Sequence, residues 1–354
     1  MRFLSLFLLL ATAVLAQPES KPVKKDRPVS EGLKQEQQVA EEKKQDAVFH
    51  LVEQEKLKPT RWDQGSTTIT NESRLDLFRP YLANKLKGGV YVGIGSTQNF
   101  TLAAWARSDY IYLVDFTRIV VLSNRVHMLF IEKSPTREKY LELWQKKNLK
   151  DALFLLKQHY KKDYKTYRWA FLTSRKFFAR HYPRMLRMSK KYKYPIYYSD
   201  DAIYDYTRRL VLKKRVLALR GDLRGTTTLK SIAATVKKMN SFISVLYLSN
   251  AEDYRILFSY PAGFKRNMMA LPAETNSMVL RTSSVYRRKR NWAPGSHYLT
   301  PRGFHYLVQP LHQFQKWLAL PRLTSGRMFD LAGRAQQKRG FTDLNRPPRQ
   351  KKKR

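Results

Sequence analysis

The stretches that decide the fold are Gly88-Gly-Val-Tyr-Val-Gly-Ile-Gly95 and Tyr110-Ile-Tyr-Leu-Val-Asp115. β-branched and aromatic residues dominate both, which is typical of strands buried on both faces of a sheet. Glycine at 93 and 95 permits a tight turn and lets a ligand approach the backbone. A helix is expected between the two strands, opening at Thr97 or Gln98. The order strand, glycine turn, helix, strand predicts a βαβ unit.

An acid ends the second of these strands. Asp115 follows Gly95 by 20 positions, the spacing at which a βαβ unit places a carboxylate on a ribose hydroxyl. Gln98 occupies the place of the third glycine in G-x-G-x-x-G, so the motif is incomplete. Two interpretations therefore remain open, a nucleotide-type site or a turn whose glycines serve the fold alone. The candidate cofactor-binding residues here are Gly93, Gly95, Gln98, Asn99 and Asp115, with Asn99 alternatively orienting the turn.

Two later strands are predicted to end in polar turns. Residues 215–220 and 242–248 read as strands, followed by Gly221–Gly225 and Ser249–Glu252, with a helix from Thr226 between them. The carboxyl ends of parallel strands meet at one edge of a sheet and bind ligands there. We therefore expect these turns to share one rim with the glycine turn.

Three residues of these later turns are candidate ligand contacts. Asp222 is a candidate catalytic general base or an acceptor for a ligand amine. It equally suits a structural role, stabilising its own turn or the following helix. Asn250 and Glu252 are candidate cofactor contacts, and the same two interpretations apply to them.

The predicted fold class is α/β, with a mainly parallel Rossmann-like sheet flanked by helices. Strands alternate with helices through the central part of the chain, whereas residues 17–58 are rich in charge and poor in aromatic residues and the C-terminal tail is strongly basic. The predicted organisation is a signal peptide (1–16), a charged disordered linker (17–58), a Rossmann-like domain (59–325) with a helical insertion at about 140–210, and a basic tail (326–354).

The N-terminus predicts export. Arg2 precedes an apolar run over residues 3–15, which is short for a membrane span, and small residues precede Gln17. The mature chain is expected to begin at Gln17 and to be periplasmic or secreted, with an uncleaved N-terminal anchor as the alternative. The chain has no cysteine, which excludes disulfides, a thiolate nucleophile and a cysteine zinc site.

The net charge of the chain indicates which kinds of partner to expect. Lys and Arg number 68 against 28 Asp and Glu, for a net charge of +40, and such a field attracts polyanions and anionic surfaces. Basic and aromatic residues interleave most densely over residues 160–206. An anionic polymer or an anionic membrane surface is expected there, nucleic acid remains open, and the alternative is a set of ordinary helices with basic solvent faces. The seven histidines form no His-Glu-x-x-His motif, so no metal is expected.

The two opening stretches, with Gln98-Asn-Phe-Thr101 between them, resemble a group of uncharacterised bacterial proteins with a class I methyltransferase-like domain. Gly221–Gly225 and Tyr247–Tyr254 support the resemblance, which covers roughly residues 70–285. It implies S-adenosylmethionine on the glycine turn, with Asp115 holding the ribose. The expected function is that of an exported methyltransferase-like protein of unknown substrate. The alternative is a non-catalytic envelope protein that binds an anionic polymer or membrane through the basic-aromatic region.

Overall fold

The computed structural model describes residues 29–83, 85–254, 257, 259–284, 304–325, 327–328, 337–338 and 340–344. The chain divides into two units, residues 1–43 and 44–354. Of the first unit, the structure describes the beginning of helix α1 (Val29–Phe49). The predicted signal peptide lies outside the described residues. No helix in the described part of the chain is long and apolar enough to span a membrane.

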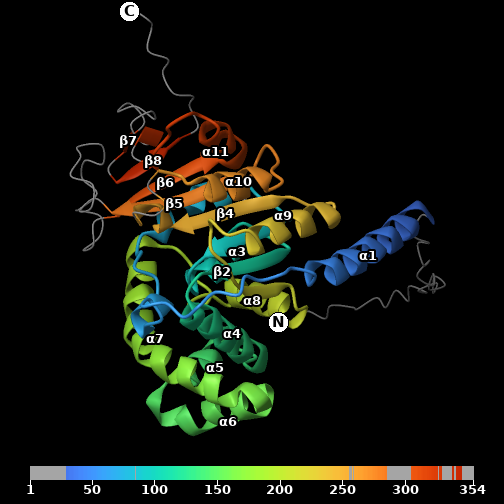
Figure 1. The fold of residues 1–354 in the computed structure, drawn as a ribbon. Coiled ribbons are helices and arrows are strands. Elements are labelled where there is room, and N and C mark those ends of the chain that lie inside the picture. The colour runs from blue at the N-terminus through green and yellow to red at the C-terminus, as the bar shows by residue number, and fades with distance from the viewer. Residues whose placement is uncertain are drawn as a thin grey trace, which may run out of the picture. The chain divides into compact units, whose positions relative to one another are not determined.

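The second unit is built on an eight-stranded sheet with the order β3-β2-β1-β4-β5-β6-β8-β7 (Figure 1). Neighbouring strands pair in parallel except for β5 with β6 and β7 with β8. This confirms the predicted α/β class and the mainly parallel Rossmann-like sheet. The strands are β1 (Val90–Ile94), β2 (Tyr110–Asp115), β3 (Val216–Arg220), β4 (Ile243–Ser249), β5 (Met278–Ser284), β6 (Phe304–Pro310), β7 (Gln337–Lys338) and β8 (Phe341–Asp343).

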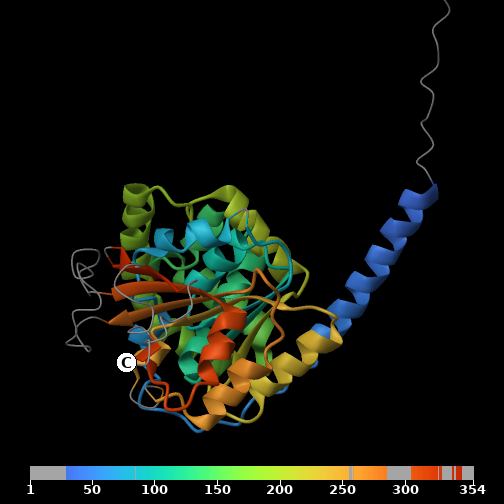
Figure 2. The ribbon, with the colours of Figure 1, turned by 90° about the horizontal axis from the view of Figure 1, so that it is seen from above.

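Helices cover both faces of this sheet, because side chains alternate along each strand. On β1, Tyr91 belongs to a core shared with α3, α4 and α8, whereas Val90 and Val92 belong to a core shared with α9, α10 and α11. Figure 2 shows the latter three helices beside one another. The helices of the second unit are α2 (Arg79–Leu82), α3 (Gln98–Trp105), α4 (Arg118–Lys133), α5 (Arg137–Glu142), α6 (Leu149–Tyr160), α7 (Tyr164–Tyr192), α8 (Asp201–Leu212), α9 (Thr228–Lys238), α10 (Ala262–Ala270) and α11 (Leu311–Leu318).

The predicted insertion lies within the connection from β2 to β3, which runs through α4 to α8. Many of its aromatic side chains face inward, where Trp144 and Phe178 pack on the buried His127 ring and Phe171 packs on Trp144. The basic side chains of α7 lie mainly on its outer face. The insertion therefore combines an aromatic core with a basic solvent face.

The structure differs from the predicted boundaries at both ends of the domain. The last part of the expected linker packs on the sheet, because the Phe49 ring stacks on Tyr112 with centroids 4.5 Å apart and Asp46 pairs with Arg215 at 2.6 Å. Within the expected tail, β8 extends the sheet and buries Phe341 and Leu344. In both segments, a few apolar residues within a polar stretch of sequence are buried in the core.

Candidate functional site

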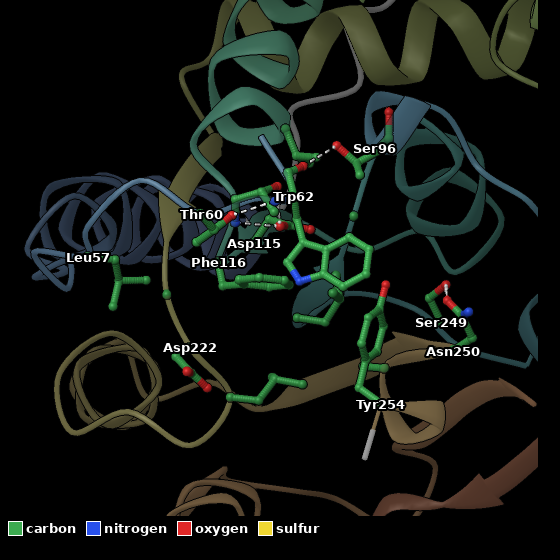
Figure 3. Close-up of a pocket in the computed structure, with 18 of the residues that line it drawn as sticks. Leu57, Thr60, Trp62, Ser96, Asp115, Phe116, Asp222, Ser249, Asn250 and Tyr254 are labelled. Carbon is green, nitrogen blue, oxygen red and sulfur yellow. Dashed lines mark hydrogen bonds between the residues drawn. The ribbon is translucent and has the colours of Figure 1, made fainter. Parts of the chain in front are cut away.

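A cavity of about 700 Å³ lies at the carboxyl ends of β1 to β4 (Figure 3). Ile94 ends β1, Asp115 ends β2, Gly221 follows β3 and Ser249 ends β4, and all four line the cavity. The strand order reverses between β1 and β4, which is where Rossmann-like sheets form a ligand crevice. These strand ends and their turns, which we call the strand-end wall, make up one side of the cavity.

The glycine turn presents both backbone and a buried amide to the cavity. Gly95 has φ +92°, a conformation that side-chain-bearing residues rarely adopt. Gln98 lines the cavity with 6% of its surface exposed. Its Nε2 lies 3.5 Å from the Tyr247 hydroxyl, and no described residue hydrogen-bonds its Oε1. A buried polar atom without a partner is costly, so Gln98 is suited to meeting a ligand.

Asp115 offers one carboxylate oxygen to the cavity. Its Oδ1 accepts hydrogen bonds from the backbone N and the hydroxyl of Thr117, at 2.8 and 2.7 Å. Its Oδ2 accepts none from the described residues. Burial raises the pKa of Asp115 to about 6, against the opposing effect of the Thr117 hydrogen bonds. The group is therefore an anionic acceptor at neutral pH and a neutral acid in mildly acidic solution.

Asp222 is held by its neighbour Arg224. Oδ1 accepts from the backbone N and Nε of Arg224, at 2.8 and 3.1 Å, and Oδ2 accepts from Nη2 at 2.6 Å. Partial burial favours a higher pKa, but these hydrogen bonds outweigh it and the pKa of Asp222 is lowered. Asp222 lines the cavity as a stable carboxylate, which suits an acceptor better than a general base.

Asn250 also lines the cavity, next to Ser249, whose φ is +51°. The Ser249 hydroxyl donates to Glu72 Oε1 at 2.9 Å and lies 3.4 Å from Asn250 Oδ1. Of the eight residues that the sequence proposed, five therefore surround one cavity. They are Gly95, Gln98, Asp115, Asp222 and Asn250.

The other three, Gly93, Asn99 and Glu252, do not line it. Asn99 Nδ2 donates to the carbonyl of Ser96 at 2.7 Å and its Oδ1 accepts from a tyrosine hydroxyl, which holds the turn in shape. Gly93 leaves room for Asn99, because a Cβ there would overlap Asn99 Oδ1. Glu252 is completely buried and pairs with Arg281 at 3.3 Å. All three make structural contacts within the fold.

The opposite side of the cavity was missed by the sequence analysis. Residues 51–71, which we call the strap, contribute much of this wall, including Leu57, Thr60 and Trp62. Figure 3 shows the Trp62 indole and the Tyr254 ring beside each other, and the two rings meet edge to face with centroids 5.9 Å apart. Trp62 is an isolated aromatic residue in a polar stretch. That isolation was the one sequence feature that could have indicated a role for this segment in the cavity.

Charged side chains fasten the strap to the strand-end wall. Arg220 Nη1 and Nη2 donate to the carbonyls of Leu57 and Lys58 at 2.6 and 2.7 Å. The Glu55 carboxylate accepts from the backbone N of Asp222 at 2.7 Å and of Thr227 at 3.1 Å. These bonds join segments more than 160 positions apart, so no local sequence pattern announces them.

Among the described residues, no group of three or more His, Cys, Asp or Glu side chains is arranged to hold a metal ion. The groups that line the cavity are instead the backbone of a glycine turn, carboxylate acceptors, side-chain amides and aromatic rings.

The fold and this cavity define a Rossmann-like α/β domain with a ligand-sized site at the point where the strand order reverses. The chain belongs to a family described as a domain of unknown function, DUF7790, whose model matches residues 67–345. The match begins within the strap and extends past β8. Among curated proteins, none matches the chain.

Proposed function

We propose that the cavity binds a nucleoside-type ligand, with S-adenosylmethionine as the first candidate. One observation carries the proposal: Gly95, Asp115 and Asp222, from three separate strand ends, surround a single cavity. Its volume of about 700 Å³ falls within the range of small-molecule sites.

The lining residues fit the parts of a nucleoside. Asp115 Oδ2 suits a pair of ribose hydroxyls, and Asp222 suits an exocyclic amine, because both are carboxylates at neutral pH. Gln98 Oε1 is a buried acceptor without a partner among the described residues. Trp62 and Tyr254 supply aromatic surface for a planar base.

The activity that we propose, methyl transfer, depends on S-adenosylmethionine being the ligand. S-adenosylmethionine supplies an electrophilic methyl group on a sulfonium when it is bound. The residues of this chain bind it, orient it and exclude water, with the strap closing one side. Because the pKa of Asp222 is lowered, we assign Asp222 to ligand binding and not to proton abstraction.

Calorimetric titration tests this proposal. S-adenosylmethionine, S-adenosylhomocysteine and adenosine are titrated into the chain from Gln17, which keeps every described residue. Saturable binding is expected, weakened about tenfold or more by Asp115→Asn, because a buried charge-assisted hydrogen bond contributes about 1.5–3 kcal/mol. Asparagine still accepts from Thr117, so the turn is retained.

The matched control is Asp151→Asn, the same chemical change at an exposed position of α6, which is expected to leave the affinity unchanged. Binding of adenosine without the sulfonium compounds would retain the nucleoside site and remove S-adenosylmethionine as its ligand. No heat with any of the three compounds at millimolar concentration would refute the proposal.

A further inference from the structure

A helical hairpin in the β2–β3 connection exposes an unusual surface. Helix α6, the turn η4 (Lys161–Asp163) and the start of α7 form this hairpin, closed by the Tyr160 and Tyr167 rings, which stack at 3.4 Å. In Figure 1, α6 lies away from β7 and β8, at the opposite end of the second unit. Seven of its exposed side chains make up what we call the hairpin surface: Phe154, Lys157, Lys161, Lys162, Lys165, Arg168 and Trp169.

This surface is strongly cationic. Residues 146–193 contain sixteen Lys and Arg against two acids, Asp151 and Asp163. Helix α7 itself contains no carboxylate along its 29 residues. None of the five cations of the hairpin surface forms a salt bridge with a described residue. Their charge is therefore directed toward solvent and attracts an external anion.

Two large apolar side chains lie among these cations. Phe154 is 61% exposed and Trp169 is 40% exposed, and both lie within two helical turns of η4. Neither side chain belongs to the hydrophobic core. The inner face of the hairpin contributes other side chains to that core, among them Leu156 and Tyr167. Exposed aromatics among lysines are typical of surfaces that enter the headgroup region of a membrane, where the rings insert and the lysine stems extend toward the phosphates.

We propose that the hairpin surface docks the protein on a bilayer that contains anionic phospholipid. The exposed aromatics favour a lipid surface over a duplex nucleic acid, because the phosphates of a duplex bind lysines while its bases are stacked inside and offer no ring to a phenylalanine. This function is separate from the cavity, which lies at the strand ends and shares no residue with the hairpin surface.

Vesicle co-sedimentation tests the proposal, using the chain from Gln17 so that the apolar segment 3–15 is absent. Vesicles of phosphatidylcholine alone are compared with vesicles that contain 30% phosphatidylglycerol. Lys161→Gln, Lys162→Gln and Lys165→Gln are combined in one variant. Its matched control changes Lys230, Lys237 and Lys238 to Gln on the exposed face of α9, which lowers the net charge equally.

Wild-type protein is expected to bind the anionic vesicles and not the neutral ones. The hairpin triple variant is expected to bind about 100-fold more weakly, since a lysine near an anionic bilayer contributes about 1 kcal/mol. The α9 triple variant is expected to lose less than threefold. An equal loss in both variants would show that total charge, and not this surface, drives binding, and would overturn the proposal.

The aromatic contribution has its own control. Phe154→Gln with Trp169→Gln is expected to weaken vesicle binding about tenfold, whereas Leu212→Gln with Met269→Gln, two comparably exposed apolar positions elsewhere, leaves it unchanged. Binding to duplex DNA that is as tight as binding to anionic vesicles, and insensitive to the aromatic pair, would replace the lipid with a nucleic acid and refute docking on a membrane.

Discussion

The two walls of the cavity are built by different means. The strand-end wall follows from backbone pairing in a parallel sheet, which fixes where Ile94, Asp115 and Ser249 end their strands. The strap is held mainly by side chains that reach backbone groups, above all Arg220 and Glu55. The strand-end wall is therefore part of the packed sheet. The strap depends on a few charged hydrogen bonds, which a single substitution can remove.

The largest expected effect breaks the strand-end wall. Gly93→Ala introduces a Cβ that would overlap Asn99 Oδ1 and the Tyr91 ring, both of which are buried. Overpacking of this kind costs about 1–3 kcal/mol, and we expect the upper end because neither neighbour has room to move. Thermal and urea unfolding measure the loss. A melting temperature equal to wild type would show that the glycine turn is looser than its packing indicates.

The contrast between the walls also explains what the sequence could predict. β1, β2 and the turn after β3 are visible because each is a local pattern of apolar residues followed by glycine or acid. Asp115 and Asp222 were placed correctly at the rim by that rule alone. Glu252, also placed at the rim by the same rule, lies in the core because Arg281, on the adjacent strand β5, supplies a buried partner. The strap remained hidden, since Glu55 accepts from the backbone N of Thr227, a residue far away in the sequence that immediately precedes α9.

A second test isolates the buried charge of the strand-end wall. Because the pKa of Asp115 is about 6 in the folded protein against 3.8 as its ordinary value, the folded state binds more protons between these values. The contribution of Asp115 to stability therefore falls as pH rises from about 4 to 6. Asp115→Asn removes this titration while keeping an acceptor for Thr117.

We expect the variant and the wild type to be similarly stable at pH 4. At pH 7 the variant is expected to be more stable by about 2–3 kcal/mol, which is about two pKa units at 1.36 kcal/mol each. Urea unfolding across this range measures the difference, and contributions from other buried acids such as Glu72 cancel between the two proteins. A difference that does not change with pH would show that Asp115 titrates normally.

The smallest expected effect on stability releases the strap alone. Arg220→Met removes the donors to the carbonyls of Leu57 and Lys58 and costs about 1–2 kcal/mol, less than the loss of a fully buried charged donor because Arg220 is partly exposed. Amide hydrogen exchange is expected to quicken about tenfold in residues 51–63 and to stay unchanged in β1, while nucleoside affinity falls. Arg220→Lys, which keeps the charge but not the paired donors, is expected to be intermediate. Unchanged exchange in the strap would mean that Glu55 holds it without Arg220, and the difference between the walls would then rest on one carboxylate.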